Sequence, residues 1–290
     1  MNNKILKVTR FTYNQILTAR WYLISTIVGI IGVIASLNLD SILKKFLGEE
    51  SVSKQQMLSQ SEIHAIVPLI VVVILFLLIM IYGASISNSV VEEKSARIIE
   101  TLLCYVKPME LLAGKIVGYM VAVVQQLAIW GVVRAIGSLF VKQSKNAVNL
   151  SDLISGPAMV LIVGSIVFGF MMYAFAFAAL ASYTDNAQDS TQLMMPVVLV
   201  IMVVYFIGLA MMRGATSPVL TVITYLPFAL PILGVSVNDL QTISMSTAVI
   251  LVLIQMAEVI VISIICSRIY RRGVVSYGIK KRKFWKVRTE

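Results

Sequence analysis

Six apolar stretches, each long enough to cross a bilayer as a helix, constrain this chain of 290 residues more than any other feature. A spanning helix needs roughly 20 mostly apolar residues. With 59% hydrophobic and 13% charged residues and a mean hydropathy of +0.90, the composition excludes an ordinary water-soluble domain. We therefore predict an all-α polytopic membrane protein. The predicted spans are residues 21–39, 66–87, 116–140, 157–183, 194–212 and 246–267.

A further apolar stretch, residues 214–240, does not suit a continuous span. It contains Pro227 and Pro231, and proline interrupts the hydrogen bonds of a helix interior. Irregular backbone at membrane depth is tolerated only where protein or water covers it. We therefore predict a broken, re-entrant hairpin on the outer side, before the last span.

The Lys and Arg residues are distributed unevenly between the two sides of the predicted bundle. One side carries 17 of them, on residues 1–20, the loop after the second span and the tail, whereas the other side carries six. Because cytoplasmic loops are enriched in Lys and Arg, both termini are predicted to be cytoplasmic. We expect a multi-pass protein of a bacterial plasma membrane, with a six-helix transmembrane domain over 21–267 and a basic cytoplasmic tail over 268–290.

The segment before the first span has an amphipathic pattern of its own. Apolar and cationic residues alternate in it at helical spacing, which suits the lipid headgroup layer. We predict an interfacial elbow helix over residues 1–20, and the plainer alternative is an N-terminus that only sets the topology. The residues that form the pattern are Lys4, Ile5, Lys7, Val8, Arg10, Phe11, Asn14 and Ile16.

A short charged stretch between the second and third spans predicts a surface helix over residues 90–106. Glu93 precedes Arg97 by four residues and Arg97 precedes Glu100 by three, which are ion-pair spacings on a helix. Pro108 ends this helix, because the residue before proline is disfavoured in the helical region, and begins the next one. The alternative is a solvated amphipathic hairpin that receives no partner.

This stretch, VVEEKSARIIETLLCYVKPMELLAGKIVG, resembles the signature segment of ABC-2 type transporter permeases, in particular the NatB-like branch. In that segment an E-K-x-x-R-x-x-E-x-L-L helix is followed by a K-P turn and a G-K-x-x-G start of the third span. The motif falls on residues 93–103, 107–108 and 114–118. The resemblance implies that a coupling helix at 90–106 meets an ATPase. The coupling residues that it implies are Glu92, Glu93, Lys94, Arg97, Glu100, Leu103, Pro108 and Lys115.

The chain lacks a G-x-x-x-x-G-K-[ST] loop, so it cannot cradle a nucleotide in that way. The resemblance implies a non-catalytic permease without a bound cofactor, an ABC ATPase subunit that holds ATP and Mg, and a second permease subunit in a homo- or heterodimer. It implies export from the cytoplasm, with a peptide, an antibiotic, a lipid-like compound or Na⁺ as substrate. Membrane lipids surround the bundle, and the clustered basic tail indicates a membrane flank, not a nucleic-acid site.

Polar residues within the predicted spans suggest a second function class. Ionisable side chains at membrane depth are functional hypotheses by default, so a secondary transporter driven by an ion gradient through Glu258 is the alternative. The antiparallel third and sixth spans predict a hydrogen bond between Glu258 and a glutamine of the third span. The plainer interpretation is a clasp between helices, worth about 0.6 to 2 kcal/mol. The predicted translocation-path residues are Gln125, Gln126, Arg134, Gln255 and Glu258.

Enzymatic alternatives find little support. Glu92, Glu93 and Arg97 form an E-E-x-x-x-R pattern that resembles the first motif of CAAX-type intramembrane glutamate proteases. Such sites need histidines from other helices, and this chain has a single one, His64, predicted on the far side. One histidine and two cysteines also do not form an ordinary zinc site, so no metal is expected.

Overall fold

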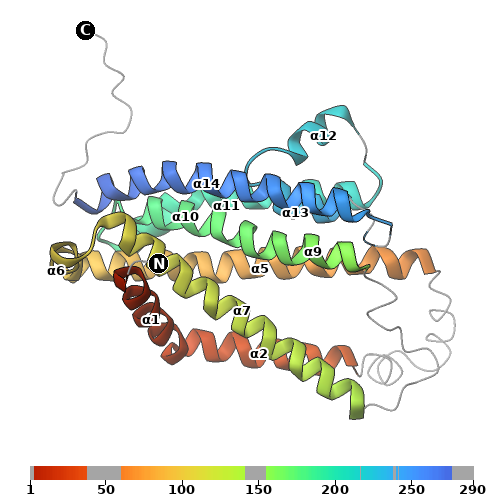
Figure 1. The fold of residues 1–290 in the computed structure, drawn as a ribbon, viewed down its shortest axis with the longest axis horizontal. Helices are drawn as coiled ribbons and strands as arrows, with labels where there is room; N and C mark the ends of the chain where they lie inside the picture. Colours follow the sequence, from red (N-terminus) through yellow and green to blue (C-terminus); the bar gives the residue numbers. More distant parts are fainter. Residues whose placement is uncertain are drawn as a thin grey trace, which may run out of the picture.

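The computed structural model describes residues 3–37, 60–140, 155–215, 217–237, 240 and 242–275, and within these ranges the chain forms helices and no strand. The long helices run side by side along the longest axis of the molecule (Figure 1). The helices of the described residues are α1 (Asn3–Thr18), α2 (Arg20–Leu37), α5 (Gln60–Ser95), α6 (Ile98–Tyr105), α7 (Pro108–Phe140), α9 (Gly156–Gly164), the π-helix η1 (Ser165–Gly169), α10 (Phe170–Ala181), α11 (Ala187–Met212), α12 (Pro218–Thr224), α13 (Leu230–Val237) and α14 (Met245–Val275).

The predicted all-α polytopic architecture is confirmed. The described residues contain five helices long and apolar enough to cross a membrane, or six if the bent pair α1 and α2 counts as one span. The continuous unit α9–η1–α10 supplies one of the five. Three helices are longer than the spans predicted within them, since α5 continues beyond Ser87 to Ser95, α7 begins at Pro108 and α14 continues beyond Ser267 to Val275. The helices extend further because their polar ends find partners within the protein.

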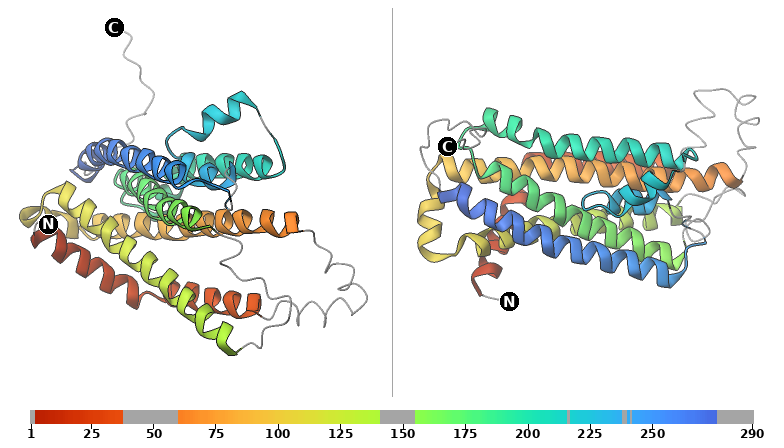
Figure 2. Two further views of the ribbon diagram at one scale, coloured as in Figure 1. Left: turned by 45° about the vertical axis from the view of Figure 1, so that its right-hand side comes forward. Right: turned by 90° about the horizontal axis from the view of Figure 1, so that it is seen from above.

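One end of the bundle gathers the segments that the sequence predicts to be cytoplasmic (Figures 1 and 2). We call it the basic end, and it comprises the start of α1, α6 and the residues beside it, residues 182–190 and the last turns of α14. Lys4 Nζ donates to the carbonyl oxygen of Tyr105 at 2.8 Å, which joins α1 to α6. Residues 38–59 and 141–154 and the predicted basic tail from 276 onward lie outside the described residues.

Helix α1 lies across the end of α7 and bends by 65° into α2 at Ala19. Two glycines allow its close approach to α7: a Cβ on Gly114 would lie 2.8 Å from Val8 Cβ, and one on Gly118 would lie 2.9 Å from Thr12 Cβ. Small residues at helix contacts are a common way to bring backbones together in lipid. The opposite face of α1 is open, with Phe11 65% exposed.

The segment at 214–240 forms two short helices, α12 and α13, joined by an irregular turn in which Phe228 has a φ of 73°. Helix α13 is buried against α5, α11 and η1. The Tyr173 hydroxyl donates to the Phe228 carbonyl oxygen at 2.6 Å, so this turn has a protein partner for its backbone. Pro231 lies against Gly169 of η1. This broken segment lies toward the end of the bundle away from the basic end (Figure 1).

Candidate functional site

The charged stretch after the second span forms two helices, not the single helix predicted over residues 90–106. Helix α5 extends to Ser95, the chain turns at Ala96 and Arg97, and α6 begins at Ile98. Arg97 adopts a left-handed conformation, with φ 56° and ψ 14°. A residue with left-handed backbone angles interrupts a right-handed helix, so the chain changes direction at this turn. Helix α6 therefore lies as a separate element across the basic end (Figure 1).

Behind α6, Glu93 and Lys115 form an ion pair between α5 and α7. Lys115 Nζ lies 2.7 Å from Glu93 Oε2 and donates to Ser89 Oγ at 3.0 Å. The lysine is 1% exposed, so the pair is withdrawn from water. A buried charge is tolerated when it is paired and hydrogen-bonded, and losing one partner leaves the other uncompensated. This pair therefore fixes the ends of α5 and α7 relative to one another.

The ion pairs predicted from helical spacing are absent from the described residues. Arg97 pairs with neither Glu93 nor Glu100, and its side chain is exposed. The helix break at Arg97 removes the regular spacing on which both predictions depended. Glu93 takes Lys115 as its partner, 22 residues further along the chain.

Lys94 points in another direction and joins three helices. Its Nζ donates to the carbonyl oxygens of Ser182, at 2.6 Å, and Gly273, at 2.9 Å. Ser182 caps the C-terminus of α10 and Gly273 lies in the last turn of α14. Carbonyl groups at helix C-termini lack intrahelical donors and carry partial negative charge, so a lysine there is favourable. A Cβ on Gly273 would collide with Ser182, which shows how closely α14 approaches this cap.

The predicted coupling residues thus divide into a buried and an exposed group. Glu93, Lys94 and Lys115 are buried in the polar contacts just described, and Pro108 begins α7. Leu103 is half-buried, while Glu92, Arg97 and Glu100 are exposed. Ser89, Ser182 and Gly273 were not predicted. No local pattern marks the last two, because they act through backbone carbonyls that approach Lys94 only in the folded chain.

The predicted path residues are held by different neighbours. The Gln125 side-chain oxygen accepts from the Tyr13 hydroxyl. The Gln126 oxygen accepts from Tyr82, and its nitrogen donates to Ser25 Oγ at 3.3 Å. Through these hydrogen bonds the two glutamines join α7 to α1, α2 and α5.

The two predicted path residues of α14, Gln255 and Glu258, have different neighbours. Gln255 Nε2 donates to Ser165 Oγ of η1 at 3.1 Å. Glu258 is half-buried, and its Oε2 accepts no hydrogen bond from the described residues, so the predicted bond to a glutamine of the third span is wrong. Gln125 and Gln126 of the third span are bonded to hydroxyl groups of α1, α2 and α5 instead. Arg134 is half-buried in α7.

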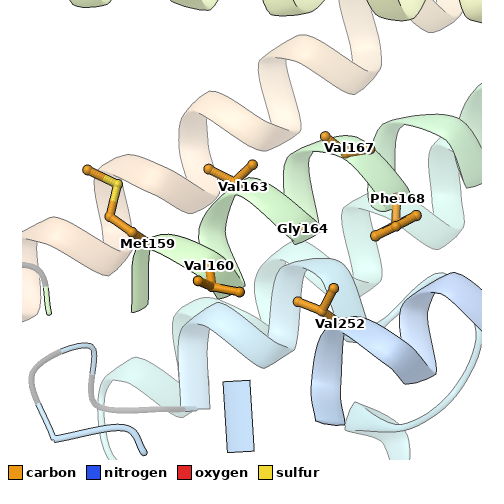
Figure 3. Close-up of a pocket in the computed structure, with 7 residues that line it drawn as sticks. All are labelled: Met159, Val160, Val163, Gly164, Val167, Phe168 and Val252. Atoms are coloured by element: carbon orange, nitrogen blue, oxygen red, sulfur yellow. The ribbon is translucent and has the colours of Figure 1, made fainter. Parts of the chain in front are cut away.

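Two hollows of similar size lie on the described surface. One, of about 460 Å³, is formed by α9, η1 and α14, and the side chains drawn in it are all apolar (Figure 3). The other, of about 450 Å³, is amphipathic and lies between the α1–α2 elbow, α5 and α7. No group of three or more His, Cys, Asp or Glu side chains in the described part of the chain could hold a metal ion.

Residues 3–267 match the family described as "ABC-2 family transporter protein". The chain belongs to this ABC-2 family. Together with its apolar helices, the membership makes it a multi-pass membrane protein of the permease type.

Two relatives of the ABC-2 chain are described as uncharacterized proteins. It is 24% identical to protein YhaP of Bacillus subtilis over 231 residues, which is 76% of this chain. It is 28% identical to protein MJ1024 of Methanocaldococcus jannaschii over 232 residues, which is 78% of this chain. The matches cover 54% of each relative, so the ABC-2 chain spans about half the length of the proteins it matches.

Proposed function

We propose that this chain is the permease subunit of an ATP-driven ABC exporter, with both termini in the cytoplasm of a plasma membrane. A separate ABC ATPase docks on α6 at the basic end, and a second permease subunit completes the transporter. The observation that carries the proposal is that α6 presents an exposed surface while the residues on either side of it are bonded to several spans. Membership of the ABC-2 family supports the same class.

The exposed side of α6 suits a protein partner. Ile98 is 49% exposed, Tyr105 73% and Met109, in the first turn of α7, 49%. We call these three residues the α6 patch. Apolar side chains beside charged ones at a bundle end are a typical docking surface, because burial against a groove removes the apolar area from water. Arg97 and Glu100 lie beside the patch and can select the partner by charge.

The inner side of α6 transmits movement to the spans. Ile99 is fully buried in the same core as Ile86, Ile116 and Tyr270. The chain on either side of α6 leads into the Glu93–Lys115 ion pair and the Lys94 contacts. A displacement of α6 therefore acts on α5, α7, α10 and α14 together. ATP binding by the partner shifts the permease between conformations only to the extent that it favours one of them.

The test is a reconstituted pair of this chain with its ATPase subunit. Replacing Ile98 and Tyr105 by Ala together is expected to reduce copurification and stimulated ATP hydrolysis at least tenfold, since buried aromatic residues dominate protein interfaces. Asp189→Asn, which changes an exposed side chain of α11 at the same end of the bundle, is the control. Full coupling in the double variant would contradict docking at α6. Transport by the permease alone would refute the whole proposal.

A secondary transporter remains the second candidate because the buried Oε2 of Glu258 has no hydrogen-bond donor among the described residues. Such a group can receive a proton or a cation during transport. Transport assays in vesicles distinguish the two functions. If Glu258 drives exchange, uptake of the transported compound follows an imposed ion gradient without ATP, and this uptake is lost in the Glu258→Gln variant. If the ATPase drives export, the gradient alone gives no transport.

A further inference from the structure

The amphipathic hollow at the α1–α2 elbow is a groove with two different walls. It has a volume of about 450 Å³, and we call it the elbow groove. Helix α2 lies beside α7 (Figure 2) and packs mainly on it, not on α5. The residues that line it are Gln15, Ile16, Ala19, Trp21, Ile81, Ala84, Ser85, Asn88, Ser89, Glu92 and Tyr119.

The polar wall comes chiefly from one face of α5. Ser85, Asn88, Ser89 and Glu92 follow one another at spacings of three, one and three residues, which places them on the same side of a helix. Two of them already have partners within the protein: Ser85 Oγ lies 3.1 Å from the Tyr119 hydroxyl, and Ser89 Oγ accepts from Lys115.

The remaining polar groups are available to a ligand. The side chains of Asn88, Glu92 and Gln15 are exposed, and none of them forms a hydrogen bond or ion pair with the described residues. One carboxylate and two carboxamides thus face a hollow that no other part of the described chain fills. Such a set offers a charge together with both donors and acceptors.

The charge of the groove has one sign. Glu92 is the single charged side chain among the lining residues. Lys115 is 1% exposed and forms its ion pair with Glu93, not with Glu92. A carboxylate in a partly apolar recess attracts a cation more strongly than one in open water, because the local dielectric is lower.

The second wall is apolar. It is formed by Ile16, Ala19, Trp21, Ile81 and Ala84, and lies on the span side of the polar residues. The Trp21 ring meets the Tyr82 ring edge-on, with centroids 5.3 Å apart, which holds the indole in place. Ile81 is 42% exposed. Hydrocarbon placed along this wall would be removed from water while an attached headgroup reached Glu92.

We propose that the elbow groove binds a monovalent cationic amphiphile, with its ammonium group at Glu92 and Asn88 and its hydrocarbon against Ile81, Ala84 and Trp21. As the recognition site for an exported compound the groove rests on the proposed function, but binding itself needs neither ATP nor the ATPase. The two ideas are therefore tested separately.

The experiment measures equilibrium binding of radiolabelled dodecyltrimethylammonium, below its micellar concentration, to the full chain in lipid nanodiscs. Empty nanodiscs give the partitioning background. We expect saturable binding that Glu92→Gln weakens about tenfold, as for the loss of one contact with an oppositely charged group. Asn88→Leu should weaken it less, and Ala84→Trp, which fills the groove, should abolish it. Asp189→Asn removes an exposed carboxylate of α11 at the same end and should leave binding unchanged.

Competition identifies the ligand class. Unlabelled dodecyltrimethylammonium should displace the probe, whereas dodecyl sulfate and dodecanol should not at equal concentration. The proposal is overturned if the wild-type chain binds no more than empty nanodiscs, if Glu92→Gln and Asp189→Asn bind equally well, or if dodecanol competes as well as the cation. Binding with no α6-dependent ATPase coupling would refute the proposed function alone, and coupling without binding would refute this inference alone.

Discussion

The Glu93–Lys115 ion pair gives the sharpest test of how the basic end is held together. Replacing Lys115 by Met keeps the length of the side chain but leaves the Glu93 carboxylate in a buried site without its cation. Removing one partner of a buried pair typically costs about 3 to 5 kcal/mol. The lost donation to Ser89 is part of the same contact. We expect Lys115→Met to destabilise the chain by about 3 kcal/mol, because Glu93 keeps a small exposed fraction.

A double-mutant cycle separates the pair from mere packing. Glu93→Gln alone leaves the lysine uncompensated, whereas Glu93→Gln with Lys115→Met removes both charges and should recover about 2 kcal/mol relative to the sum of the single changes. The assay is thermal unfolding of the purified chain in nanodiscs, where about 1 kcal/mol corresponds to roughly 2 to 4 °C. Additive single changes, or a Lys115→Met variant as stable as wild type, would refute the reasoning.

Three further predictions follow from neighbouring contacts. Lys94→Met should loosen the ends of α10 and α14 at the basic end, lowering stability by about 2 kcal/mol and increasing amide exchange at residues 182–186; protection equal to wild type would contradict this. Gly118→Leu should push α1 away from α7, because even a Cβ there would lie 2.9 Å from Thr12. Thermal unfolding of the Gly118→Leu variant in nanodiscs provides the check, and a melting temperature equal to that of the wild type would contradict this prediction. Arg97→Gly should raise stability by up to about 1 kcal/mol, since glycine adopts the left-handed conformation without steric cost, and a lower melting temperature would count against this.

The helices were predictable because membrane thickness imposes a length on each apolar run. The runs that became α5, α7, α11 and α14 are visible without any tertiary information. Their ends were less predictable, since residues such as Glu93 and Lys94 look like a solvated surface when only the sequence is considered. They remain within a helix because Lys115 and the Ser182 and Gly273 carbonyls compensate their charges.

The sequence predicted where along the chain the candidate site lies, but not how its side chains are arranged. The motif drew attention to the charged stretch that the structure places at the basic end, and Pro108 located the start of α7. The left-handed turn at Arg97 was not visible, because arginine shows no preference for that conformation. The partners of Gln126 and Gln255 were also hidden, since hydroxyl groups from three other helices reach them only after the bundle assembles.

The Lys94 contacts have a mechanical consequence. The helix ends at Ser182 and Gly273 share one ammonium group, so α10 and α14 cannot separate from α5 without stripping carbonyl groups of their donor. These three helices form one limb of the molecule. The other limb is formed by α1, α2 and α7. Gly114 and Gly118 bring α7 close to α1, and the Trp130 indole nitrogen of α7 donates to the carbonyl oxygen of Thr26 in α2 at 3.3 Å. The elbow groove is the space between the two limbs. The Glu93–Lys115 pair and the Tyr82–Gln126 hydrogen bond cross from one limb to the other, so a rotation that widened the groove would have to turn about these contacts or break them.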